Sequence, residues 1–201
     1  MAKFFGNLHL VLVVGLVAAI AVMMAFTGWT DEGAREVTND VTRWLHSFFG
    51  ILWIGLLYYL NFVQVPTMPA IPAEQKPAII GHIAPRVFFF FRWSALLTVG
   101  FGLIIAIHAG YAADALLFRG EEGVPFGSNG KNLIGLGMWL ALIMAFNVWF
   151  IIWPAQKKIL GIVDASAEEK AAAAPRALAA SRTNLLLSLP MLYCMVSANL
   201  G

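Results

Sequence analysis

The sequence predicts an all-α, polytopic transmembrane helical bundle of about five spans. Hydrophobic residues make up 60% of the 201 residues and charged residues only 12%, and the mean hydropathy is +0.78. A soluble domain carries about 25% charged residues, because its surface faces water. The apolar runs lack the alternation of membrane β-strands, so lipid leaves helices as the spanning structure.

Five apolar runs have roughly the length of about 20 residues that one crossing needs. The first follows Lys3 and resembles a signal peptide, but it is long for one and no small-x-small cleavage site follows, so we expect a retained helix. The second is closed by Pro66, and the fourth is stopped by Pro154. We predict spans at residues 8–26, 44–65, 87–108, 133–153 and 185–200, within a single membrane domain of residues 1–201.

Two loops between these runs have distinct compositions. Residues 165–182 are rich in alanine and charge, and predict a cytoplasmic amphipathic helix that starts or breaks at Pro175. Residues 119–132 hold four glycines and one proline, which is typical of an ordered turn.

The charges that flank the runs predict the orientation. The N-terminus, the second loop and the fourth loop, with Arg92, carry nine basic and four acidic residues, whereas the other side carries four basic and seven acidic ones. The positive-inside rule therefore places the N-terminus inside and the C-terminus outside. We expect a multi-pass protein of the bacterial inner membrane.

Composition also excludes several kinds of partner and cofactor. The net charge of +2 is too small to indicate nucleic-acid binding. Cys194 is the only cysteine, so the chain has neither an intrachain disulfide nor the Cys-x-x-Cys-His motif of covalent c-type haem attachment.

Four histidines are the strongest candidates for chemistry, because ionisable residues in a membrane are expensive and usually functional. His46 and His108 are predicted near the outer face, on antiparallel runs. His9 and His82 are predicted near the inner face. Each face thus holds two histidines from two different segments.

The outer pair has the pattern of bis-histidine haem b ligation, in which two imidazoles meet the iron from facing helices at equal depth. Gly50 lies one turn from His46 and would let a flat porphyrin approach. Trp53 and Phe101, each seven residues from a candidate ligand, could line the macrocycle edge, and Arg43 could meet a propionate.

Other interpretations stay open. An interfacial histidine often serves only in hydrogen bonding, and this interpretation is favoured for His9 and His82, the alternative being a second haem. Asn147 and Ser188 are predicted to form interhelical hydrogen bonds.

Four segments resemble the membrane domain of cytochrome-type urate oxidases. They are WLHSFFGILWIGLLYYLNFVQVPTMP from Trp44, FRWSALLTVGFGLII from Phe91, NVWFIIWPAQKKILG from Asn147 and SRTNLLLSLPMLYCM from Ser181. The pattern of His46, Trp53 and Gly55 is also similar to copper-resistance membrane proteins and to haem-binding protoporphyrinogen oxidases. The resemblance implies that His46 is a haem b ligand.

Family members carry a C-terminal cytochrome c domain, whose motif these residues lack. We therefore expect a membrane-bound b-type cytochrome that transfers electrons between a small-molecule donor, such as urate, or a quinol and a separate cytochrome c or respiratory complex. The alternatives are the membrane subunit of a urate oxidase, a haemless accessory subunit of a larger redox complex, and a copper transporter, which the lack of paired methionines or cysteines disfavours.

Overall fold

The structure, a computed structural model, describes residues 2–27, 33–120 and 130–198. These residues form helices and turns, without a strand, so the predicted all-α class is confirmed. The chain divides into two units, Met1–Arg43 and Trp44–Gly201, where the sequence predicts one domain.

The first unit contains α1 (Ala2–Phe5), α2 (Leu8–Thr27) and the start of α3 (Gly33–Tyr58). The side chain of Asn7 accepts a hydrogen bond of 3.1 Å from the amide of Leu10, which satisfies one free donor of the first turn of α2. Apolar side chains are exposed around α2, as expected of a helix whose solvent is lipid.

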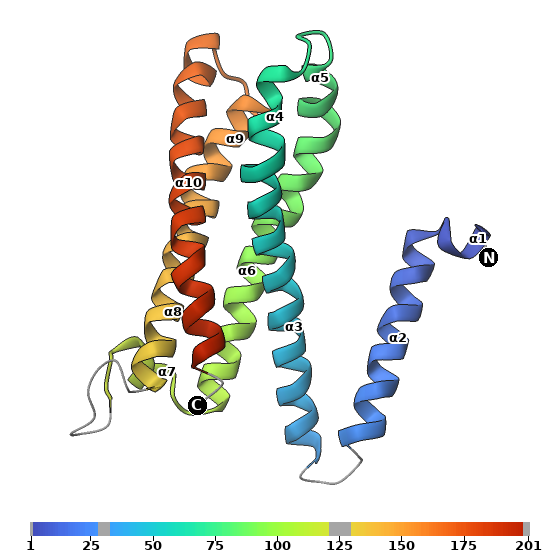
Figure 1. The fold of residues 1–201 in the computed structure, drawn as a ribbon, viewed down its shortest axis with the longest axis vertical. Helices are drawn as coiled ribbons and strands as arrows, with labels where there is room; N and C mark the ends of the chain where they lie inside the picture. The colour runs from blue at the N-terminus through green and yellow to red at the C-terminus, as the bar shows by residue number, and fades with distance from the viewer. Residues whose placement is uncertain (1, 28–32, 121–129, 199–201) are drawn as a thin grey trace. The chain divides into compact units, whose positions relative to one another are not determined.

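The second unit is an up-and-down bundle of four long helical rods (Figure 1). The first rod joins α3 to η1 (Tyr59–Gln64) and α4 (Val65–Thr67), and the short η2 (Met68–Ala70) follows. The second joins α5 (Lys76–Ala78), η3 (Ile79–Ile83) and α6 (Ala84–His108). The third joins α8 (Gly130–Phe146), η5 (Asn147–Ile152) and α9 (Trp153–Ile159). The fourth is α10 (Ala167–Ser197), and the short α7 (Ala112–Leu116) packs against α8.

Prolines explain why three rods contain a π-helical segment. Pro66, Pro85 and Pro154 each stand two residues after the end of such a segment, η1, η3 and η5 respectively. A proline ring collides with the carbonyl group four residues earlier, and a wider turn relieves that collision. The rods therefore continue through Pro85 and through Pro66 and Pro154, where the sequence predicts that two spans end.

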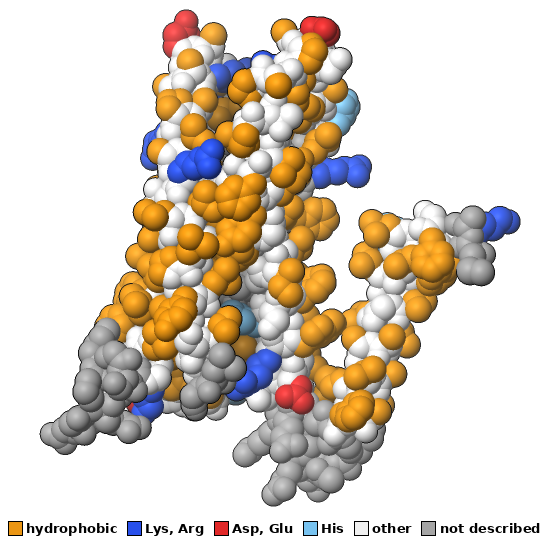
Figure 2. All heavy atoms as spheres, in the orientation of Figure 1, with side chains coloured by type: hydrophobic (Ala, Val, Ile, Leu, Met, Phe, Trp, Pro, Cys, Tyr) orange, Lys and Arg blue, Asp and Glu red, His pale blue; other side chains and the backbone are white. Residues whose placement is uncertain are grey.

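Four segments are long and apolar enough to cross a membrane: Leu8–Phe26, Val37–Ala70, Lys76–His108 and Gly130–Ile159. They contain the first four predicted spans. Hydrophobic side chains cover the visible face of the bundle along most of its length, and both basic and acidic side chains lie toward the end that holds the α9–α10 turn and the start of α5 (Figure 2). The span count and the orientation stay predictions.

The predicted fifth span and the predicted amphipathic segment form one helix in the structure. The 31 residues of α10 run unbroken through Pro175 and Pro190. Ala173 and Ala177 pack against Ala155 of α9, because small side chains let two helices approach closely. The alanine-rich stretch is therefore a helix–helix contact, and α10 is about 46 Å long at 1.5 Å per residue.

The core of the second unit lies where the four rods meet. Its centre combines aromatic and aliphatic side chains from every rod: Trp53, Leu57, Phe91, Ala95, Met144, Val148, Ile152 and Met191. Close contacts at glycine bring α8 near its neighbours. A Cβ atom at Gly137 would lie 3.0 Å from the Cβ of Cys194 in α10, and one at Gly135 would overlap the backbone carbonyl of Ala115 in α7.

Candidate functional site

His46 is held between two rods by a hydrogen bond and by a close backbone contact. Its Nδ1 lies 2.8 Å from the carbonyl oxygen of Thr98 in α6. A Cβ atom on Gly102, one turn further along α6, would lie only 2.9 Å from the imidazole Cε1. Because Gly102 has no side chain, the half-buried imidazole ring can pack directly on the backbone of α6.

The hydrogen bond determines which nitrogen of His46 can act as a ligand. A carbonyl oxygen only accepts, so Nδ1 must carry the proton and donate it to Thr98. In the neutral ring this leaves Nε2 as the atom with a free lone pair. A histidine that binds a metal typically has this arrangement, with its second nitrogen donating to a backbone carbonyl.

The residues predicted to surround a haem are spread over the α3–α6 contact. Gly50 faces Thr98, whose Cγ2 would lie 3.6 Å from a Cβ at that position. Phe101 stacks on Phe49 with ring centroids 5.9 Å apart and planes at 4°. Trp53 is buried in the core, and its Nε1 has no hydrogen-bond partner among the described residues.

His108 is the last residue of α6 and is exposed. It stands six residues beyond Gly102, which corresponds to about 9 Å along the helix axis and about a third of a turn around it. The pairing of His46 with His108 through one haem stays a prediction. Arg43, the predicted propionate partner, donates from Nε to the side chain of Asn39 at 3.3 Å, within its own helix.

The two histidines that the sequence predicts near the inner face are both exposed. His9 lies in α2 of the first unit, and His82 lies in η3 of the second. Their role in a second haem stays a prediction. Within the described ranges, no three His, Cys, Asp or Glu side chains gather as ligands of a metal ion.

A set of buried amides, which sequence reasoning found only in part, joins the rods near their middle. Asn147 of η5 donates to the side chain of Asn184 in α10 at 2.9 Å, and Asn184 donates in turn to the backbone carbonyl of Met144 at 2.9 Å. The predicted interhelical role of Asn147 is thereby confirmed. Asn184, which is fully buried, could have been noticed as a lone amide before an apolar run.

A second set of polar contacts joins α10 to the first rod. Asn61 of η1 donates both to the carbonyl of Leu57 and to the hydroxyl of Ser181, each at 2.9 Å. The Tyr58 hydroxyl lies 3.2 Å from the Ser188 hydroxyl, which confirms the interhelical contact predicted for Ser188. In an apolar surrounding such bonds fix which helix faces meet.

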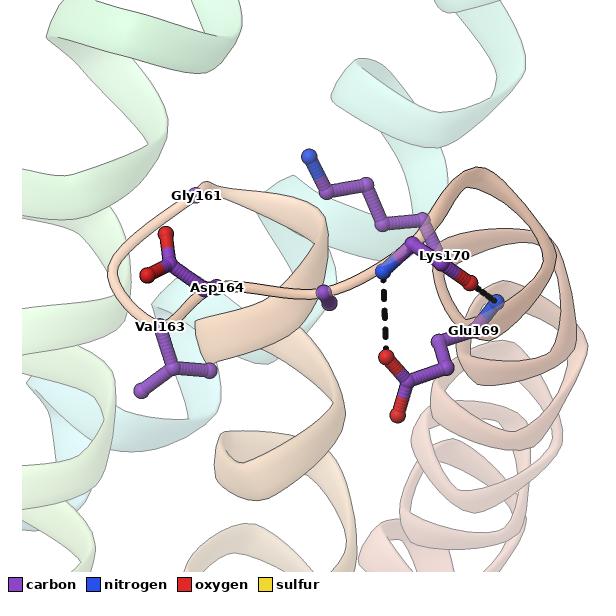
Figure 3. Close-up of a pocket in the computed structure, with 7 residues that line it drawn as sticks. Gly161, Val163, Asp164, Glu169 and Lys170 are labelled. Atoms are coloured by element: carbon purple, nitrogen blue, oxygen red, sulfur yellow. Dashed lines mark hydrogen bonds between the residues drawn. The ribbon is translucent and has the colours of Figure 1, made fainter.

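A shallow polar pocket lies at the α9–α10 turn, and the interactions of its residues stabilise that turn. Figure 3 shows Asp164, Glu169 and Lys170 around it. Ser166 and Glu169 form a capping box at the start of α10, and Glu169 pairs with Lys158 at 2.8 Å. The hydrogen bond from Lys158, followed by the bond to the Ser166 amide, holds the pKa of the Glu169 carboxyl below its ordinary value. These interactions explain how α10 begins.

Comparison with known proteins found one family. Residues 126–201 match the family described as "Urate oxidase N-terminal". No curated protein and no solved structure matched the chain. The match includes all of the third rod and all of α10, and with them the Asn147–Asn184 contact. The resemblance predicted from the sequence is confirmed for this family, whereas the wider superfamily stays a prediction. Residues 126–201, which form the C-terminal helices, are thus similar to the urate oxidase N-terminal family.

Proposed function

We propose that the chain is a membrane-bound b-type cytochrome related to urate oxidases, in which His46 would bind the haem. The observation that carries this proposal is the hydrogen bond from Nδ1 of His46 to Thr98, because it directs the free lone pair to Nε2. The family match and the membrane-spanning helices support it.

The residues around His46 are suited to a histidine that would bind a haem. Thr98 accepts through its carbonyl, and its own hydroxyl donates to the carbonyl of Ser94 at 2.7 Å. Gly102 leaves room for the imidazole. The ring is thereby fixed in one tautomer and one position, which strengthens its basicity toward a metal. A haem b held there would supply one-electron transfer.

His108 is the second ligand in this proposal. It lies on the helix that already positions His46, at the outer end of the predicted span. The electron donor would be urate or a quinol, and a separate cytochrome c or a respiratory complex would be the acceptor. With either donor and either acceptor, the residues of this chain would bind and orient the haem that carries the electron.

The function can be tested in vesicles that contain the full chain. Urate or a quinol is added, and the reduction of added soluble cytochrome c is followed by absorbance. We expect His46→Ala to abolish the reduction and His82→Ala, at an exposed position of η3, to preserve it. Activity of His46→Ala equal to that of His82→Ala would contradict the role of His46, and a wild-type chain that reduces no cytochrome c would favour a haemless accessory subunit.

A further inference from the structure

Arg92 is a cation within the second rod, and aromatic rings surround it. Its guanidinium Cζ lies 3.8 Å from the centroid of the Trp153 ring at the start of α9, and 5.4 Å from that of Phe89. Trp149 donates from Nε1 to the backbone carbonyl of Arg92 at 3.0 Å, and its ring meets Trp93 edge to face at 5.4 Å. These contacts hold the arginine between α6 and the third rod.

Among the described residues, no anionic side chain pairs with the guanidinium of Arg92. In the part that the structure describes, none of the ion pairs and side-chain hydrogen bonds includes its nitrogen atoms. A guanidinium group placed over the Trp153 ring keeps its N–H donors for other partners. Arg92 is therefore available to an anion from outside the chain.

A second cation lies next to the same ring. Lys157 follows Trp153 by one helical turn on α9, so the two side chains share a face. Lys157 is half-buried, and it too forms no ion pair within the described residues. Its neighbour Lys158 forms an ion pair with Glu169. Arg92 and Lys157 therefore place two free positive charges around one tryptophan.

The position of this cluster indicates a lipid headgroup as the anion. Trp153 ends the apolar run of the third rod, where tryptophan marks the boundary between hydrocarbon and headgroups. Phe89, which contacts Arg92, and Trp93, which contacts Phe89, are exposed aromatic side chains of the kind that face acyl chains. The basic character of this end predicts the cytoplasmic leaflet, which holds the anionic lipids.

We propose that Arg92, Trp153 and Lys157 form a binding site for the phosphate of an anionic phospholipid between α6 and α9. Arg92 binds two phosphate oxygens through its paired N–H groups, and Lys157 adds a point charge. This site is independent of the haem proposal, because none of its residues contacts His46 or Thr98 in the contacts described above.

Native mass spectrometry of the purified full chain, titrated with phosphatidylglycerol or with phosphatidylcholine of the same acyl chains, tests the site. We expect one molecule of phosphatidylglycerol to bind tightly to each chain, and no molecule of phosphatidylcholine to do so. Arg92→Gln should weaken that binding by about tenfold, as expected from the loss of charge-assisted hydrogen bonds. Arg86→Gln is the matched control, since it removes the same charge from an exposed position of α6.

Three outcomes would overturn the proposal. They are equal binding of both lipids, an unchanged affinity in Arg92→Gln, and full competition by millimolar inorganic phosphate, which would indicate a site for soluble anions. If Arg92→Gln does not fold, Lys157→Gln decides, because that side chain stacks on no ring. Weaker phosphatidylglycerol binding in Lys157→Gln supports the site, and unchanged binding contradicts it.

Discussion

The imidazole of His46 in α3 and the backbone carbonyl of Thr98 in α6 form a hydrogen bond of 2.8 Å. The two residues are 52 positions apart in the chain, so the bond fixes both the contact of two rods and the tautomer of the histidine. The proposed chemistry of the chain depends on this bond.

Gly102→Ala should displace the His46 ring. The added methyl group would lie 2.9 Å from the imidazole Cε1, and such overpacking typically costs about 1–3 kcal/mol. We expect a lower thermal midpoint in detergent and a changed haem spectrum. Gly100→Ala, on the same helix and facing open space, should leave both unchanged. If the two variants behave alike, Gly102 does not position His46.

Gly135→Ala should destabilise the contact of α8 with α7. A Cβ atom there would overlap the carbonyl group of Ala115, a backbone atom that cannot move aside by a rotamer change. We expect a loss of about 3 kcal/mol or more, at the upper end of the overpacking range, measured by unfolding in denaturant. Gly55→Ala meets nothing within 4 Å and should be neutral. Equal stability of Gly135→Ala and wild type would contradict this packing.

Asn184→Leu should loosen the association of α10 with the third rod. The substitution removes the acceptor of Asn147 and the donor to Met144, and leaves buried polar groups unpaired. Interhelical hydrogen bonds in membranes contribute about 0.6 kcal/mol on average, and an unpaired buried group costs about 1–3 kcal/mol. Thermal unfolding should show this loss, whereas the exposed neighbour change Thr183→Ala should not. A stable Asn184→Leu protein would show that the amide set is dispensable.

Acidification should release the first turn of α10. The pKa of Glu169 is lowered in the folded chain, chiefly by the hydrogen bond from Lys158, so the folded state takes up the proton less readily than the unfolded state. Its contribution to stability is complete above the unfolded pKa of about 4.3 and is lost as the pH falls through the lower folded value. The protection factors of the turn amides, which are exchange rates corrected for the intrinsic effect of pH, should therefore fall below about pH 4. Glu169→Ala, which removes the hydrogen bonds to Lys158 and to the Ser166 amide, should show low protection factors at every pH; a turn that stays protected at low pH would contradict this.

Much of the fold could be predicted because membrane spans follow from long apolar runs. The π-helical segments at Pro66, Pro85 and Pro154 could not, since a proline that ends a helix and one that widens it look alike in sequence. The sequence also could not predict that residues 167–197 form the single helix α10. The packing of Ala173 on Ala155 depends on which helices are neighbours.

The candidate site also has residues that the sequence predicts and residues that it does not. His46 stands out in the sequence as an ionisable residue in an apolar run. Its partner Thr98 does not, because the bond is made by a backbone carbonyl that every residue possesses. Asn184 is visible as an amide, but its partners Asn147 and Met144 depend on the rotation of two helices about their axes.

A reduced-minus-oxidised spectrum with pyridine haemochrome quantification, on the full chain purified in mild detergent, measures the proposed cofactor directly. We predict a b-type Soret band in the wild-type protein, with at least one haem per chain, and its loss in His46→Ala but not in His82→Ala. A wild-type protein without a Soret band, or a His46→Ala protein that retains its haem, would contradict the assignment of His46 as the ligand.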